Sequence, residues 1–343
     1  MSKIINMNQF SKKIIDWQKK QGRNNLPWQK KSAYEVWISE IMLQQTQVET
    51  VIPYYEKFIS TFPEIKTLAE SSEDQVMSLW SGLGYYSRAR NIHKSAKIIF
   101  EKFKGEFPKN FESLIELPGI GPSTAGAILS LAFELPGVIL DGNVKRVIAR
   151  YKNISNPIDN NETQKELKSF AEALLPKNSF RAYSQGIMDL GSLLCRSKNP
   201  SCHLCPVSKN CQAFKFETQE KIPFKNTPRP KKEKKVDWLL ISSKNKVLLK
   251  RNKNNGIWKN LWLFPSKDIL SQDNLCLLEK KEDLPDIVHN LSHQKLKIST
   301  MKYKIENKDR LKIDRSCTVW VSKADSVKMG MPKPIKEIID NYL

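Results

Sequence analysis

Four cysteines stand within a short stretch of the chain, with the spacing C-x6-C-x2-C-x5-C: Cys195, Cys202, Cys205 and Cys211. Thiols this close together favour a metal centre over a pair of disulfides, because thiolates are natural ligands of soft metals. The spacing by itself admits either zinc or an iron–sulfur cluster. Basic residues flank the group, namely Arg196, Lys198, Lys209 and Lys215. We therefore expect a rigid metal-bearing loop that meets phosphate.

A carboxylate suited to acid catalysis stands at Glu40. Helical spacing over residues 34–47 places it beside Trp37 and Ile41, on or near an apolar face, while Glu35 can turn outward. A carboxyl in these surroundings is partly desolvated, so its pKa should rise toward that of a useful general acid. A structural salt bridge is the alternative. The polar run Gln44–Gln47 suits a wet cleft or contacts with base edges.

A second carboxylate, Asp141, ends an apolar run and precedes a helical pattern that includes Val144. Its local role is that of an N-cap. Hydrogen bonds from the helix start favour the ionised form, so Asp141 should stay an anion while Glu40 keeps its proton. Two carboxyls with separated pKa values are the usual pattern for cleaving a glycosidic bond. One protonates the leaving group, and the other stabilises the oxocarbenium-like sugar.

A glycine-rich turn, Leu-Pro-Gly-Ile-Gly-Pro at residues 117–122, separates two helical patterns. Gly119 and Gly121 allow positive φ and close backbone approach, and Pro122 suits the first position of a helix. That helix offers free N–H groups to an anion, so the motif predicts a helix-hairpin-helix that grips phosphate without reading sequence. A helical corner without a ligand is the alternative.

The net charge of the chain indicates a polyanion as its partner. Its 57 Lys and Arg against 36 Asp and Glu give a net charge of +21, more than an enzyme of small neutral substrates needs. Part of this excess is solvated surface in a sequence rich in Lys and Asn. No secretory leader and no apolar run of membrane-spanning length occurs, so we expect a cytoplasmic protein. Cys276 and Cys317 are expected to be ordinary thiols.

The elements that must position these groups fall into two domains. Apolar residues recur at helical spacing over 10–216, which predicts an all-α domain over 1–217, with the hairpin at about 111–131 and the cysteine loop at 195–211. Prolines amid lysines predict a basic, extended linker over 218–235. Apolar runs at 236–241 and 246–250 flank a polar turn, which predicts a β-hairpin opening an α+β domain over 236–343.

Several of these motifs occur together in one known family. Five motifs follow one another along the chain. They are Glu-Ile-Met-Leu-Gln-Gln-Thr-Gln-Val at 40–48, Gly-Leu-Gly-Tyr-Tyr at 82–86, the hairpin, Leu-Asp-Gly-Asn-Val at 140–144 and the four cysteines. Together they resemble the A/G-specific adenine DNA glycosylases of the helix-hairpin-helix, endonuclease III-like superfamily. The resemblance implies a monomeric base excision repair enzyme that hydrolyses the N-glycosidic bond of adenine mispaired with 8-oxoguanine or guanine in duplex DNA. It also implies that the cysteines hold a [4Fe–4S] cluster.

The resemblance assigns roles to individual residues. Glu40 protonates N7 of the adenine and helps activate water, Asp141 steadies the sugar C1′, and Asn143 orients these groups. The adenine must first be flipped out of the duplex, at a cost of a few kcal/mol. The residues that contact DNA are Gln45 and Tyr85, which wedge beside the orphaned partner base, Leu83 close to them, and Gly119, Gly121 and Ser123 of the hairpin.

Position 123 discriminates within the superfamily. Relatives that also cut the DNA backbone carry a lysine there as the amine of a Schiff base, whereas this chain has Ser123, so we expect a monofunctional glycosylase. The rival enzyme is a bifunctional pyrimidine-lesion glycosylase and lyase of the same fold. The rival outside enzymes is a metal-bearing DNA-binding protein in which Glu40 is structural and Asp141 only caps a helix.

The C-terminal half carries a second resemblance. Gly-Ile-Trp-Lys-Asn-Leu-Trp-Leu-Phe-Pro at 256–265 and His-Asn-Leu-Ser-His at 289–293 resemble the Nudix-like domain of the same family. This implies 8-oxoguanine recognition by Leu291, Ser292 and His293. Residues 236–343 contain no pyrophosphatase box of clustered glutamates, so the domain should bind rather than hydrolyse. Leu291 stands where many relatives have Phe, which removes a stacking contribution of roughly 1 kcal/mol.

Overall fold

The computed structural model describes residues 2–224, 230–267, 271, 274 and 276–343. The chain divides into two compact units, Met1–Ala69 with Lys94–Pro228 and Glu70–His93 with Arg229–Leu343. Residues 225–229 of the predicted linker lie outside the described residues. A segment of the helical half, Glu70–His93, therefore groups with the C-terminal half of the chain.

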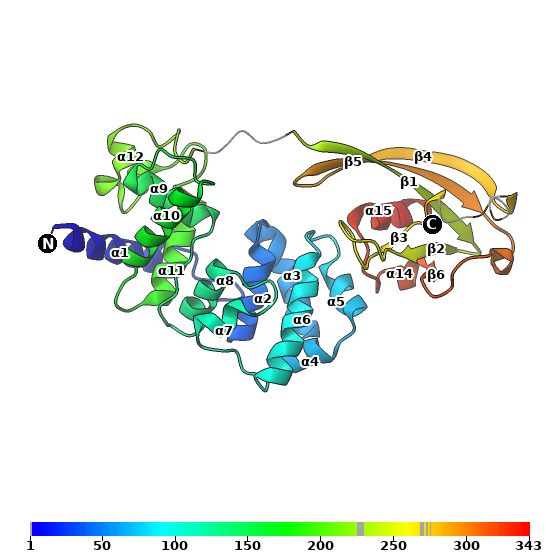
Figure 1. Cartoon of the computed structure of the whole chain (residues 1–343), viewed down its shortest axis with the longest axis horizontal. Helices are drawn as coiled ribbons and strands as arrows, with labels where there is room; N and C mark the ends of the chain where they lie inside the picture. The colour runs from blue at the N-terminus through cyan, green and yellow to red at the C-terminus, as the bar shows by residue number, and fades with distance from the viewer. Residues whose placement is uncertain (1, 225–229, 268–270, 272–273, 275) are drawn as a thin grey trace. The chain divides into compact units, whose positions relative to one another are not determined.

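The first unit is helical (Figure 1), as its apolar periodicity predicts. Its α-helices, including two that cross into the second unit (α4 and α6), are α1 Ser2–Gln21, α2 Ala33–Leu43, α3 Val48–Thr61, α4 Ile65–Glu70, α6 Ser87–Lys102, α7 Phe111–Ile115, α8 Pro122–Ala127, α9 Gly142–Lys152, α10 Asn161–Ala173, α11 Phe180–Asp189 and α12 Gln212–Lys215. Two π-helical segments, Ile128–Ala132 and Leu190–Leu194, extend α8 and α11. Short 3-10 turns follow at Cys202–Leu204 and Ser208–Asn210.

Helix α2 is fixed at its start and along one face. Ser32 and Glu35 form a capping box, in which each side chain accepts the other residue's backbone N–H. Glu35 thus points away from the core, as predicted. Trp37, Ile38 and Met42 are fully buried, and this burial sets the rotation of the helix and the direction of Glu40.

The predicted helix-hairpin-helix is formed by α7 and α8. Gly119 has a φ of 82°, which a side chain would strain, and Pro122 is the first residue of α8. Gly121 differs from the expectation: its φ of −89° is open to other residues, and it serves as the N-cap of α8. Its place in the motif therefore does not rest on left-handed backbone.

The second unit contains a six-stranded sheet of β1 Lys232–Ser243, β2 Lys246–Arg251, β3 Trp262–Leu263, β4 Glu279–Asn290, β5 Gln294–Lys304 and β6 Thr318–Ser322. The order is β3-β2-β1-β5-β4, with β6 also paired to β2; β1 and β5 are parallel, and the other pairs are antiparallel. Among its described residues, the unit also contains the helices α5 Glu73–Trp80, α14 Lys323–Ser326 and α15 Lys333–Tyr342, with a 3-10 turn at Lys308–Arg310.

The predicted hairpin between β1 and β2 is confirmed. Lys244 and Asn245 form its two-residue turn, with φ values of 45° and 60° that suit the twist of the flanking strands. Strand β1 begins at Lys232, inside the range predicted as linker, because it pairs with β5 from Lys232 onward. The sequence pattern detects strands by their apolar runs, so it missed this lysine-rich part of β1, which is held in the sheet by backbone hydrogen bonds to β5.

Each unit has its own apolar core. In the first, Phe10 and Ile14 of α1 pack with Ile148 of α9 and Ile187 of α11. In the second, Leu239 of β1 belongs to a core cluster of the sheet. Among the described residues no helix is long and apolar enough to cross a membrane.

A backbone contact between α8 and the segment before α9 gives a test of this packing. A Cβ at Gly126 would lie 2.0 Å from the carbonyl oxygen of Val138, a contact that no rotamer relieves. We expect Gly126→Ala to lower the free energy of unfolding by at least about 1–3 kcal/mol, measured by urea denaturation. Gly121→Ala is the control, because nothing lies within 4 Å of its Cβ position. Equal stability of the two variants would contradict the packing.

Candidate active site

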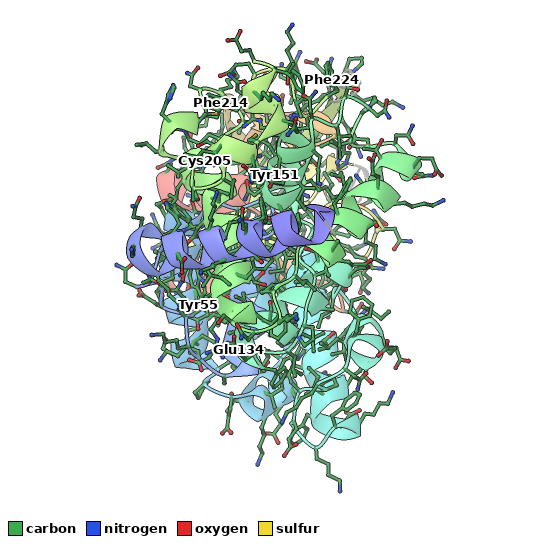
Figure 2. All side chains as sticks on the ribbon, turned by 90° about the vertical axis from the view of Figure 1, so that its left-hand side faces the viewer. Tyr55, Glu134, Tyr151, Cys205, Phe214 and Phe224 are labelled. Atoms are coloured by element: carbon green, nitrogen blue, oxygen red, sulfur yellow. The ribbon has the colours of Figure 1, made fainter. Side chains whose placement is uncertain are left out.

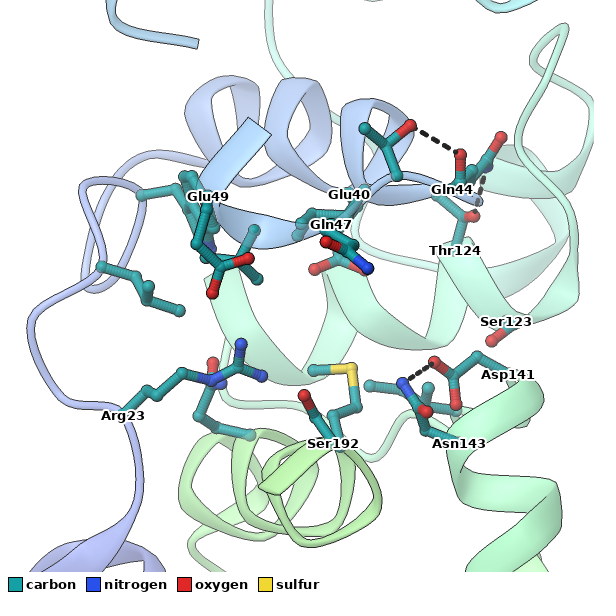
Figure 3. A pocket seen from close by; sticks show the side chains of 18 of the residues that line it. Arg23, Glu40, Gln44, Gln47, Glu49, Ser123, Thr124, Asp141, Asn143 and Ser192 are labelled. Carbon is teal, nitrogen blue, oxygen red and sulfur yellow. Dashed lines mark hydrogen bonds between the residues drawn. The ribbon is translucent and has the colours of Figure 1, made fainter. Parts of the chain in front are cut away.

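Glu40 and Asp141 line one cavity of the first unit. The cavity has a volume of about 800 Å³, and Asn143, Ser123 and Gln44 are also in its wall. Figure 3 shows Glu40 reaching into the cavity from one side and Asp141 and Asn143 standing on the other. Helix α2 supplies the first group and the start of α9 the other two. Two carboxyls separated by a hundred residues thus face one space.

Asp141 is the N-cap of α9, as predicted. Its Oδ1 accepts the backbone N–H of Val144 at 2.8 Å, and its Oδ2 accepts a long 3.5 Å contact from Asn143 Nδ2. The backbone before α9 is held as well, since Leu140 donates its N–H to Ser123 Oγ at 3.1 Å. The helix start therefore fixes both the position and the orientation of the Asp141 carboxylate.

The two carboxyls differ in their electrostatic surroundings. Burial, and then the negative charge of Asp141, raise the pKa of Glu40 to about 7. Burial also raises the pKa of Asp141, against the opposing effect of N–H groups at Val144 and Asn143 and of the Arg146 charge. The hydrogen bonds favour the Asp141 anion as predicted, but burial outweighs them. Among the described residues none lowers the pKa of Glu40 in this way, so Glu40 is the carboxyl that holds a proton near neutrality.

Arg146 connects this site to the cysteine loop. Its Nη2 donates to Asn143 Oδ1 at 2.8 Å and to the Gly191 carbonyl at 2.6 Å, while its Nε donates to the Cys195 carbonyl at 2.7 Å. Gly191 fits closely here, because a Cβ on it would lie 2.7 Å from the Cβ of Asn143. Sequence reasoning missed Arg146, although its place one helical turn after Asn143 was a usable signal.

The opposite part of the cavity contains further residues that sequence reasoning missed: Arg23, Trp28 and Gln185. Arg23 is paired with the fully buried carboxylate of Asp189, at 2.6 Å between Nη2 and Oδ1, and Gln185 Nε2 donates to the same Oδ1 at 2.9 Å. No local pattern could have found these residues, because α1, the loop after it and α11 meet only in the folded chain.

The four cysteines surround a second cavity, with Arg150 and Tyr151 beside them. Figure 2 labels Cys205 near Tyr151 and Phe214, which line the same cavity. Arg150 is buried and donates from Nη1 to Cys195 Sγ at 3.4 Å. In the described part of the chain, no three Cys, His, Asp or Glu side chains form a group that could hold a single metal ion.

The chemistry of these thiols suits a cationic metal centre. Burial raises the pKa of the Cys205 thiol to about 12, so its thiolate needs a strong positive partner. All four predicted sulfur ligands line this one cavity, although no three of them are grouped closely enough in the described structure to hold a single ion.

Residues 82–85 carry the predicted wedge residue Tyr85, and this loop, the wedge loop, is held in a defined shape. Gly82, Gly84 and Tyr85 have φ values of 104°, 77° and 49°. Trp80 Nε1 donates to the Gly84 carbonyl at 3.0 Å, and the Arg88 guanidinium lies 5.3 Å from the Tyr85 ring. Tyr85 is 42% exposed, whereas Leu83 is only 6% exposed. Of these two predicted DNA contacts, only Tyr85 is presented to solvent.

The remaining predicted DNA contacts are accessible. Gln45 is exposed and has a φ of 57°, and Gly121 has open space at its Cβ position. Gly119 forms the turn of the hairpin. Ser123, in contrast, lines the active-site cavity and holds Leu140.

The residues predicted to recognise 8-oxoguanine form the tip of the β4–β5 hairpin. Leu291 N–H donates to the Gln294 carbonyl at 2.9 Å, and Ser292 Oγ lies 3.2 Å from His293 Nδ1. Together with Tyr85 and Trp258, they line a cavity of about 470 Å³ in the second unit. The predicted wedge and the predicted recognition loop thus share one space.

Comparison with known proteins decides the family. Residues 38–173 match the family described as HhH-GPD superfamily base excision DNA repair protein, and residues 237–341 match the NUDIX domain. An adenine DNA glycosylase of Buchnera aphidicola subsp. Baizongia pistaciae (strain Bp) is 44% identical, over 96% of this chain and 95% of that protein. Another, from Buchnera aphidicola subsp. Acyrthosiphon pisum (strain APS), is 41% identical over 97% of each. The chain belongs to the adenine DNA glycosylase family.

Membership in this family confirms the predicted fold, a helix-hairpin-helix glycosylase domain followed by a Nudix-like domain. The solved structure of a thermostable thymine-DNA glycosylase is similar with a TM-score of 0.57 and 26% identity, over 63% of this chain and all of that one. An endonuclease III–DNA complex has the same fold, with a TM-score of 0.52 and 21% identity, over 62% of this chain and 98% of that one.

The raised pKa of Glu40 predicts a pH-dependent cost to stability. Its value rises from an ordinary 4.5 to about 7, so the folded chain binds more protons than the unfolded chain between these pH values. Stability from this group therefore declines as pH rises through that window. We expect Glu40→Gln to be more stable than the parent above pH 7, by up to roughly 3 kcal/mol, with little gain near pH 4.

Urea denaturation at both pH values measures this difference. Glu49→Gln is the matched control, because Glu49 lines the same cavity but is exposed. A Glu40→Gln effect that is the same at both pH values would contradict the raised pKa.

Proposed function

We propose that this chain removes adenine mispaired with 8-oxoguanine or guanine from duplex DNA by hydrolysing the N-glycosidic bond. One observation carries the proposal: a carboxyl with a pKa near 7 faces an N-capped carboxylate across one cavity. The net charge of +21 supports duplex DNA as the partner. One chain supplies every residue that the proposal needs, so we propose a monomer.

The reaction follows from the two carboxyls. Glu40 donates its proton to N7 of the flipped adenine, and the bond from C1′ to N9 breaks with its electron pair going to the base. The Asp141 carboxylate, aligned by Asn143, stabilises the cationic sugar. Water then adds at C1′ and gives its proton to the Glu40 carboxylate, which restores the acid. Each turnover leaves free adenine and an abasic site.

The second candidate, a combined glycosylase and lyase, lacks its amine. Ser123 stands in the cavity where such an enzyme needs lysine, and its hydroxyl accepts the Leu140 N–H. A serine hydroxyl forms no Schiff base with an opened sugar. We therefore propose a monofunctional glycosylase.

Partner recognition is assigned to the cavity of the second unit. Tyr85 is exposed at its wall and suits insertion beside the orphaned base, and Ser292 and His293 supply hydrogen-bonding groups. Leu291 supplies apolar contact without an aromatic face. The buried Leu83 supports the wedge rather than entering the duplex.

The four cysteines are proposed to hold a [4Fe–4S] cluster. Their shared cavity, the buried Arg150 and the basic residues Arg196 and Lys198 support a metal centre that shapes a cationic loop. When bound, the cluster would supply positive charge that stabilises the thiolates. The chain's own contribution to the reaction remains with Glu40 and Asp141.

Base release from defined duplexes tests the proposed reaction. We expect free adenine from A:8-oxoguanine and A:G duplexes, at a single-turnover rate that falls as pH rises through about 7, where Glu40 loses its proton. Glu40→Gln should abolish release while it spares binding, and Glu101→Gln, at an exposed glutamate that does not line the cavity, should leave both unchanged. Binding without any adenine release by the parent protein would favour the non-catalytic alternative, and high-yield borohydride trapping of a covalent adduct would favour the lyase.

Metal analysis tests the cysteine loop separately. We expect protein purified without oxygen to be brown and to contain about four irons per chain. Cys205→Ser should lose iron and colour, whereas Cys276→Ser should keep both, because Cys276 is exposed and distant in sequence from the loop. A colourless protein with one zinc per chain would overturn the cluster.

A further inference from the structure

The wedge loop of the helical half is tied to the backbone of the C-terminal half by two hydroxyls. Tyr86 Oη donates to the Met331 carbonyl at 3.0 Å, and Ser81 Oγ donates to the same carbonyl. Tyr86 Oη also accepts the Gly82 N–H at 3.4 Å. Both side chains are buried. The two residues flank the loop 82–85, so one carbonyl oxygen holds it at both ends.

The surrounding contacts make this attachment firm. Arg251 Nη1 pairs with Asp74 Oδ2 at 2.7 Å, and Asn260 Nδ2 donates to Glu73 Oε1 at 3.1 Å, so the first turn of α5 is held by the C-terminal half. Arg90 Nη1 donates to the Lys259 carbonyl at 2.8 Å. These contacts lie before and after the wedge loop in sequence.

The Met331 carbonyl is itself fixed in place. Gly330, just before it, accepts the Trp262 N–H at 3.0 Å through its own carbonyl. A Cβ on Gly330 would lie 2.5 Å from the Cβ of Met77 in α5, so the two backbones are in close contact. The anchor is therefore backbone that has little freedom to follow a misplaced loop.

We propose that Tyr86 and Ser81 are positioning residues that lock the wedge loop onto the Met331 carbonyl. This lock fixes Tyr85 in relation to Ser292 across their shared cavity, so that insertion of the wedge and recognition of the partner base occur at one geometry. The inference rests on the proposed function, because it assumes that this cavity receives the orphaned base. Tyr86 itself lines that cavity, whereas Ser81 lines neither of the two cavities; the inference gives both hydroxyls a role in partner recognition.

Tyr86→Phe tests the lock, because it removes the hydroxyl and keeps the buried ring. The variant loses the hydrogen bond to the Met331 carbonyl and the longer one from the Gly82 N–H. Since the shorter bond alone is worth about 1 kcal/mol, we expect affinity for a duplex with 8-oxoguanine opposite a non-cleavable adenine analogue to fall at least roughly 5-fold. Single-turnover adenine release at saturating enzyme should stay unchanged, because Glu40 and Asp141 belong to the other unit. Fluorescence of 2-aminopurine placed beside the partner base should report weaker unstacking by Tyr85.

Ser81→Ala and the double variant complete a thermodynamic cycle. Because both hydroxyls share one acceptor, we expect their effects on duplex affinity to be non-additive. Tyr303→Phe is the control, since that hydroxyl lies 3.9 Å from Met301 Sδ in the same unit and, among the described residues, is not in the wall of the recognition cavity. It should leave affinity and fluorescence unchanged.

The outcomes separate this inference from the proposed function. Unchanged affinity and fluorescence in Tyr86→Phe would overturn the lock. So would an equal loss of affinity and single-turnover rate, which would indicate general damage. If the parent protein releases no adenine, the proposed function fails, while the fluorescence signal of the wedge still tests the lock independently.

Discussion

The start of helix α9 is the constraint on which the rest of the active site depends. Asp141 caps that helix, and Arg146, one turn later, holds Asn143 on one side and the Cys195 carbonyl on the other. A single rigid element thus spans from the carboxylate that we propose stabilises the sugar to the loop that carries the thiols. Because Gly191 fits without room for a Cβ, this arrangement has little freedom to relax.

Burial gives the two carboxyls different tasks. The pKa of Glu40 is raised toward neutrality because its carboxyl is buried and faces the negative charge of Asp141, and no described residue lowers it. Asp141 is desolvated too, yet two backbone N–H groups and a guanidinium favour its ionised form. The same low-dielectric cavity therefore keeps one group as a proton donor and the other as the better-stabilised anion, at a cost in stability above neutral pH.

Local sequence patterns predicted the candidate catalytic residues better than the residues that hold them in position. Glu40, the Asp141 cap, the first residue of α8 and the β1–β2 turn could all be read from short-range rules, and the structure agrees. Leu83 could not be read in this way, because its motif places it beside the wedge while the fold buries it. Arg23 and Asp189 form their ion pair across 166 positions, so no window of sequence contains both.

By itself, the sequence determined which residues can donate protons, cap helices and bind metal, because these properties belong to side-chain type and to neighbours within a few positions. It also determined the family, through motifs whose order is preserved along the chain. Tertiary structure alone decided that residues 70–93 group with the C-terminal half and that Tyr86 reaches the Met331 carbonyl, 245 positions away. Burial and long-range hydrogen bonds come from packing, and packing joins segments whose separation in sequence carries no record of their contact.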